Sequence, residues 1–134
     1  MRETLEGGCL CGAVRYRIEA EAAEASICHC ATCRRAAGAP SVAWATVAVD
    51  AFAWTAGAAA RHASSAEVLR THCAVCGTCL TYQSAPDSID VTLASLDDPE
   101  AIRPASEIWL SHRLRWEAVD PARPGFPRGS QEDD

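Results

Sequence analysis

The stretch "GCLCGAVRYRI", Gly8 to Ile18, combines the two features that decide the fold. The second half of this stretch belongs to "GAVRYRIEA" (Gly12 to Ala20), in which apolar and basic residues alternate from Val14 to Ile18 with the period of a half-buried strand. The first half of the stretch carries Cys9 and Cys11 two positions apart. Such side chains share one face of a strand, and they reach one metal ion only if the chain turns, which the following Gly12 allows. The stretch therefore predicts β structure held by a metal.

Four further stretches predict strands, because each is short, contains β-branched or aromatic residues and alternates in polarity. They are residues 41–47, 67–73, 80–84 and 88–96. Helical signals are few: "HCATCRRAAG" predicts one or two turns ended by Gly38, and residues 19–25 predict an exposed loop because they have no apolar face. Residues 107–119 fit neither period. We expect one mainly β domain over residues 1–127 and a disordered polar tail over 128–134.

Composition limits the possible functions. The chain has 134 residues and is 49% hydrophobic, but much of that share is alanine, so bound metal is expected to help hold the domain together. The net charge is −6 and every basic residue is arginine, which argues against a nucleic-acid partner. The sequence has no signal-peptide pattern and no membrane-length apolar run, so we expect a cytoplasmic protein. In that reducing compartment the eight cysteines are expected to bind metal or react as thiols.

The cysteines fall into three groups along the chain. A pair near the start and a Cys-x-x-Cys pair near residue 75 can form a closed, structural zinc site, which we assign to Cys9, Cys11, Cys73 and Cys76. The remaining motif, "CHCATC", supplies three ligands, and three protein ligands with one open position are typical of a catalytic zinc. We assign this second zinc to Cys28, Cys30 and Cys33.

Three motifs, "GGCLCGAVRYRI", "CHCATCRRAAGAP" and "HCAVCGTCLTY", together resemble the glutathione-dependent formaldehyde-activating enzyme family. The resemblance implies a zinc-binding β-tent fold of packed antiparallel sheets, similar to methionine-R-sulfoxide reductases. It also implies two zinc ions, one structural and one catalytic, on the cysteines assigned above. The implied activity is that of a carbon–sulfur lyase of the S-(hydroxymethyl)glutathione synthase type, which joins glutathione to formaldehyde or a related small electrophile.

Three positions depart from the family pattern. Cys79 stands where the family usually has proline, so the choice between Cys76 and Cys79 as a ligand stays open. His72 replaces an aromatic residue, and Glu107 replaces an expected histidine, which puts one substrate contact in doubt.

Other residues near the motifs are open to two interpretations. Arg34 and Arg35 could bind the carboxylates of glutathione or form a solvated pair. His29 is expected to point away from the metal and to contact residues around it. The general acid is left open among four histidines, which are His29, His62, His72 and His112.

Alternatives to the open zinc enzyme also remain. The three-cysteine site could be closed by His29, His72, Cys79 or a carboxylate. The chain could instead be a non-catalytic zinc-stapled β domain that binds a protein partner, or a thiol redox protein that uses Cys79.

Overall fold

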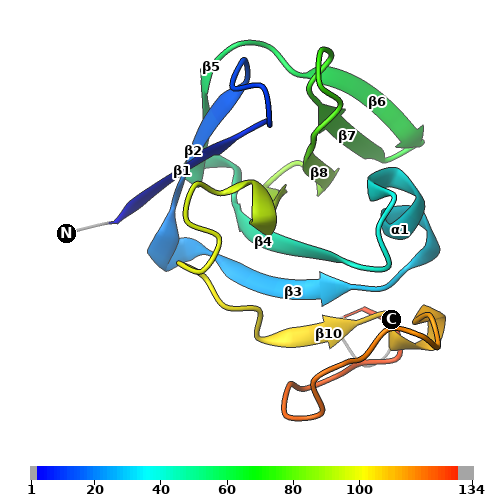
Figure 1. The fold of residues 1–134 in the computed structure, drawn as a ribbon. Helices are drawn as coiled ribbons and strands as arrows, with labels where there is room; N and C mark the ends of the chain where they lie inside the picture. Colours follow the sequence, from blue (N-terminus) through cyan, green and yellow to red (C-terminus); the bar gives the residue numbers. More distant parts are fainter. Residues whose placement is uncertain (1–2, 130–134) are drawn as a thin grey trace.

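The computed structural model describes residues 3–129, which form two β-sheets and one short α-helix (Figure 1). The small sheet is antiparallel with the order β1-β2-β5, and the large sheet has the order β10-β3-β4-β9-β8-β7-β6. The strands are β1 (Thr4–Gly8), β2 (Arg15–Glu19), β3 (Glu24–Cys28), β4 (Val42–Ala48), β5 (Phe52–Ala56), β6 (Ala60–Ser65), β7 (Val68–His72), β8 (Cys79–Ala85), β9 (Ser88–Thr92) and β10 (Ser106–Ile108). The helix α1 spans Ala31–Ala37, and 3-10 turns span Ala20–Ala22, Val49–Ala51, Leu93–Ser95 and Leu110–His112.

The mainly β prediction is confirmed, with one correction to the strand directions. All described pairings are antiparallel except that of β10 with β3, which is parallel. The large sheet is therefore mixed, because β10 reaches the edge after a long connection from β9 that crosses to the far side of β3 and β4 (Figure 1). The likeness to methionine-R-sulfoxide reductases stays a prediction. No described helix is long and apolar enough to cross a membrane.

The main core lies between the two sheets and is built from alternate residues of their strands. Tyr16 and Ile18 of β2 are fully buried, as the alternation of that stretch predicted. The large sheet contributes further buried side chains, among them Val47, Leu80 and Val91. Burying each such aliphatic side chain stabilises the fold by about 1.5–3 kcal/mol.

The strongest sequence patterns gave the right elements. Strands cover most of each of the five predicted stretches, and α1 ends where Gly38 adopts a left-handed conformation with φ of 64°. The prediction for residues 19–25 was partly wrong, because Glu24 and Ala25 begin β3 and Ala25 is buried. Residues 93–95 form a 3-10 turn at the end of the stretch predicted as a strand.

Four more strands carried no signal that the sequence analysis recognised, namely β1, β5, β6 and β10. The ambiguous stretch 107–119 contains the end of β10 and a 3-10 turn. Residues 130–134 of the predicted tail lie outside the described residues. At its beginning, the backbone carbonyl of Arg128 accepts a hydrogen bond from Trp109 at 2.6 Å.

A second, smaller core cluster positions the three-cysteine motif. β3 ends at Cys28, and α1 starts three residues later at the end of the large sheet (Figure 1). Cys28 and Cys33 pack there with Val42 and Trp44 of β4. The side chain of Trp44 is almost fully buried and its ring centroid lies 5.8 Å from that of Tyr82.

Candidate metal centres

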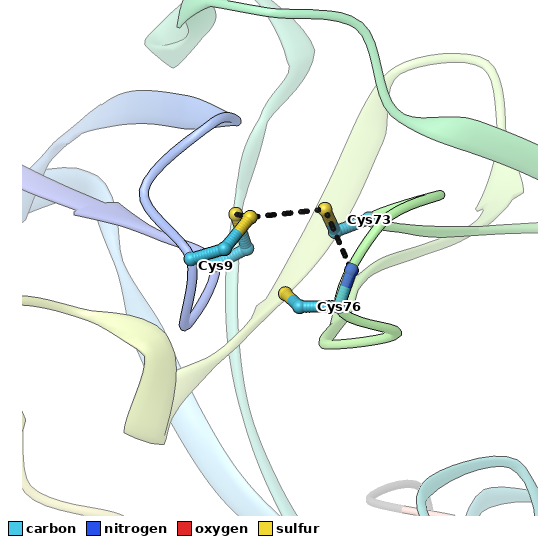
Figure 2. Close-up of side chains that lie close together, drawn as sticks. Cys9, Cys73 and Cys76 are labelled. Atoms are coloured by element: carbon cyan, nitrogen blue, oxygen red, sulfur yellow. Dashed lines mark hydrogen bonds between the residues drawn. The ribbon is translucent and has the colours of Figure 1, made fainter.

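Four cysteines from two distant turns meet beside the small sheet. Figure 2 shows the sulfurs of Cys9, Cys73 and Cys76 turned toward a common point, although more than 60 residues of chain separate Cys9 from Cys73. Cys11 belongs to the same group, and all four sulfurs lie within 4.8 Å of one another. The Cys11 sulfur lies 3.6 Å from that of Cys9 and 3.7 Å from that of Cys73.

The turns that carry these cysteines have the geometry that a metal site requires. Gly12 adopts φ of 82°, so the chain turns between β1 and β2 as the sequence analysis expected. Gly77 also adopts φ of 82° in the second turn. There, the backbone N–H groups of Val75 and Cys76 donate to the Cys73 sulfur, each at 3.4 Å. Such N–H groups stabilise the negative charge of a thiolate.

The sulfur spacing fits zinc. A tetrahedral ion with Zn–S bonds of about 2.3 Å holds its sulfurs about 3.8 Å apart, close to the two distances above. Cys79 does not join this group, although the sequence left it as an alternative to Cys76. Thr78 instead contacts Cys76, with its Oγ1 3.2 Å from the sulfur, and hydrogen bonds with Thr78 lower the pKa of Cys76 to about 5.

The second group consists of Cys28, Cys30 and Cys33, whose sulfurs also lie within 4.8 Å of one another. Cys30 is the N-cap of α1, and its sulfur accepts the backbone N–H of Cys33 at 3.3 Å. Among the described residues, no fourth His, Cys, Asp or Glu joins this group within the same distance. The arrangement is three convergent soft ligands with one side of the site not closed by a protein ligand.

The three thiols differ strongly in acidity. Hydrogen bonds from Cys28 and Cys33 hold the pKa of Cys30 far below its usual value. The pKa of Cys28 is raised because its thiol donates to Cys30 and Cys33 and is buried. The hydrogen bond with Cys28 lowers the pKa of Cys33, but the bond to Cys30 and burial raise it by more. Of the three thiols, Cys30 therefore ionises most readily, and the thiolate is the form that binds a metal cation.

His29 points away from this group and is fully buried. Its Nε2 lies 2.6 Å from Glu107 Oε1. Its Nδ1 lies 3.1 Å from Glu117 Oε1, outside hydrogen-bond geometry. Glu107 also pairs with Arg123, and Ser41 donates to Glu117 at 2.6 Å. The buried ring thus faces a glutamate at each nitrogen, which holds the loop between Cys28 and Cys30 and turns both nitrogens away from the three-cysteine group.

Besides Ser41, sequence reasoning missed two members of this network, Glu117 and Arg123. Both lie in the C-terminal segment, which runs beside β10 (Figure 1). Backbone bonds of Glu107 to Pro124 and Phe126, at 2.8 and 2.9 Å, hold the segment in place. No motif marks these residues, because only the fold brings them to His29.

The other candidate residues are not members of the three-cysteine group. Arg34 and Arg35 line a surface depression of about 430 Å³ with Leu114 and Trp116. His62 and His112 are exposed, and His72 is half-buried on β7. None of these histidines is part of either cysteine group.

Cys79 occupies an intermediate position between the two cysteine groups. It packs against the cluster that contains Cys28 and Cys33, and burial raises the pKa of its thiol. It also lines a mostly apolar cavity of about 430 Å³, together with Cys9 of the first group and Ala37 of α1. This cavity is a second space, besides the depression beside Arg34, that could admit a small molecule.

One residue near the three cysteines carried no sequence signal. Arg70 of β7 is buried, and its Nη2 lies 3.9 Å from the Cys33 sulfur. It follows Leu69 in "EVLRTHC", where a charged residue in an alternating strand is normally solvated.

A mainly β chain with two cysteine groups able to hold zinc defines a class of zinc-stapled β proteins. The sequence profile of the family described as "Glutathione-dependent formaldehyde-activating enzyme" matches residues 4–112, and the chain belongs to this family. Membership gives it an enzyme-like role and suggests formaldehyde activation with glutathione.

Comparison with solved structures also found a related fold. The crystal structure of a Rhodobacter sphaeroides protein from a structural genomics programme superposes with a TM-score of 0.58 at 26% identity, over 70% of this chain and 89% of that chain. No curated protein matches the sequence.

Proposed function

We propose that this protein is a zinc-dependent carbon–sulfur lyase-type enzyme that adds a thiol, such as glutathione, to formaldehyde or a related small electrophile. In this proposal Cys28, Cys30 and Cys33 hold a catalytic zinc, and Cys9, Cys11, Cys73 and Cys76 hold a structural one. The observation that carries the proposal is the set of three convergent sulfurs that no fourth described ligand residue completes.

The proposed reaction is balanced without an oxidant or a reductant. The thiol sulfur forms a bond to the carbonyl carbon, the π bond of the carbonyl breaks, and the proton of the thiol ends on the former carbonyl oxygen. When bound, zinc would keep an incoming thiol in its thiolate form near neutral pH. Because both nitrogens of His29 face glutamates, we expect the proton to reach the product oxygen from water.

The residues around the site would hold and orient the thiol. Arg34 and Arg35 follow Cys33 directly on α1, so they lie within about one helical turn of the proposed metal site. Their guanidinium groups could bind the carboxylates of glutathione in the depression beside Trp116. His29, fixed by Glu107, would keep the backbone of the Cys28–Cys30 loop in place.

Zinc stoichiometry and turnover test the proposal together. The wild-type protein should bind about two zinc ions per chain, and Cys30→Ser should bind about one. Adduct formation from glutathione and formaldehyde, followed by NMR against the uncatalysed rate, should be lost in Cys30→Ser. The matched control is Cys79→Ser, which removes a nearby thiol outside the group and should keep both zinc ions and turnover. Two zinc ions without any acceleration would refute the activity while leaving the metal sites in place.

A further inference from the structure

Arg70 is a buried cation held in one orientation. Its residue surface is only 7% exposed. Its Nε donates to Ser64 Oγ at 3.2 Å, and its guanidinium carbon lies 4.8 Å from the centroid of the Tyr82 ring. These contacts fix the guanidinium plane, and Nη2 faces Cys33 of the second core cluster.

The two terminal nitrogens of this guanidinium have no oxygen acceptor among the described residues. Nη2 lies 3.9 Å from the Cys33 sulfur, and Nη1 is buried without a hydrogen-bond partner among the described residues. A buried N–H group without a partner costs about 1–3 kcal/mol, and more when the group is charged. Such a group normally faces a ligand or a counter-charge in the working protein.

No carboxylate of the described residues forms an ion pair with Arg70. Asp90 stands on the same row of the sheet, but β8 lies between β7 and β9, so its Cα is about 9–10 Å away. Asp90 also has a raised pKa because it is buried. The thiols near Arg70 are Cys79, whose pKa is raised by burial, and the three-cysteine group, whose Cys33 sulfur lies 3.9 Å from Nη2.

We propose that Arg70 is the counter-cation of the metal-loaded three-cysteine centre, and that its charge makes the centre prefer an anionic fourth ligand, a thiolate, over a neutral one. This inference rests on the proposed function, since it concerns the ligand of the same centre. Three thiolates around a divalent ion leave a net charge of −1, which Arg70 cancels. A thiolate would otherwise bring the buried site to −2, whereas a neutral ligand adds no charge and gains little from Arg70.

The charge preference can be measured by ligand binding to the cobalt-loaded protein, without any turnover. Cobalt(II) replaces zinc in such sites, and its visible and near-ultraviolet absorption changes when a fourth ligand binds. The wild type, Arg70→Gln and Arg70→Lys are titrated with 2-mercaptoethanol, which binds as a thiolate, and with imidazole, which binds as a neutral ligand. Arg61→Gln, on the exposed face of β6, is the matched control.

The expected result is a selective loss. Arg70→Gln should weaken binding of 2-mercaptoethanol about tenfold or more and leave imidazole within about twofold. Arg70→Lys, which keeps the charge, should retain most of the thiolate affinity, and Arg61→Gln should match the wild type. Equal loss for both ligands, or no loss for either, would overturn the proposal.

The outcomes also separate this inference from the proposed function. If Arg70→Gln weakens only thiolate binding, and the wild type does not accelerate the glutathione–formaldehyde reaction, the role of Arg70 stands and the proposed activity is refuted. Acceleration with unselective ligand binding would keep the activity and refute the role of Arg70. A wild-type cobalt spectrum that neither ligand changes would overturn the role of Arg70 and the open coordination position together.

Discussion

Replacing Glu107 with glutamine should destabilise the protein by about 3 kcal/mol. Glu107 is 2% exposed, and its two carboxylate oxygens contact His29 and Arg123. Glutamine keeps the shape but offers one acceptor oxygen, so its NH₂ group must face one of two donors. Breaking a buried ion pair costs about 3–5 kcal/mol, and the lower end applies here because Arg123 is 22% exposed and water can partly replace its partner.

Urea denaturation of the zinc-loaded protein, followed by tryptophan fluorescence, measures this loss as a shift of the midpoint at constant slope. The midpoint temperature of thermal unfolding should fall by roughly 10 °C for a chain of this size. The control is Glu67→Gln in the exposed turn between β6 and β7, which should change stability by less than about 0.5 kcal/mol.

A double-mutant cycle shows how much of this loss of stability comes from the Glu107–Arg123 ion pair. Glu107→Gln and Arg123→Gln should be less costly together than the sum of the single changes, with a coupling of about 1–2 kcal/mol. A cost below about 1 kcal/mol for Glu107→Gln, with no coupling to Arg123, would refute the conclusion that this buried pair anchors the C-terminal segment to the His29 loop.

Three further results are expected. Gly57→Ala should lower the free energy of unfolding by about 2–4 kcal/mol, because φ is 73° and a Cβ would lie 2.1 Å from a backbone carbonyl oxygen. Gly38→Ala, where a Cβ would meet open space, should lower it by about 1 kcal/mol. Equal losses in chemical denaturation would contradict this. Burial raises the pKa of Tyr16 to about 12, so folding favours its neutral form and the wild type should lose about 2 kcal/mol as pH rises from 10 to 12. Tyr16→Phe should not show that loss, and parallel pH profiles would count against it. Zinc affinity of the three-cysteine centre should rise as pH increases through neutrality, because a thiol must release its proton before its sulfur binds zinc; chelator competition should show this rise, and an affinity that does not depend on pH would contradict it.

The sequence by itself was sufficient for the strong local signals. The alternation around Tyr16 predicted β2, and the spacing of "CHCATC" with Gly38 predicted a short helix, because both patterns depend on neighbouring residues. The grouping of Cys9 and Cys11 with Cys73 and Cys76 could also be predicted, since "CHCATC" keeps three cysteines together in one short loop and leaves two short-spaced pairs to combine.

Local patterns could not predict the elements whose stability comes from pairing. The start of β3 looked like a loop, because residues 19–25 have no apolar face, and the strand exists through its bonds to β4 and β10. The very short β10 gave no periodic signal, since three residues are too few to show one.

Sequence thus determined which side chains could bind metal, and tertiary structure decided the electrostatic surroundings in which they would do so. Arg70 reaches Cys33 across 37 positions of sequence, and Arg123 reaches Glu107 from a segment without any motif. The spacing of the cysteine ligands is visible in short stretches of sequence, because one turn of the chain must bring its sulfurs together. The charged side chains around a buried site come from the strands that lie beside it in the sheet. These strands can be distant in the sequence, because electrostatic interactions depend on distance in space.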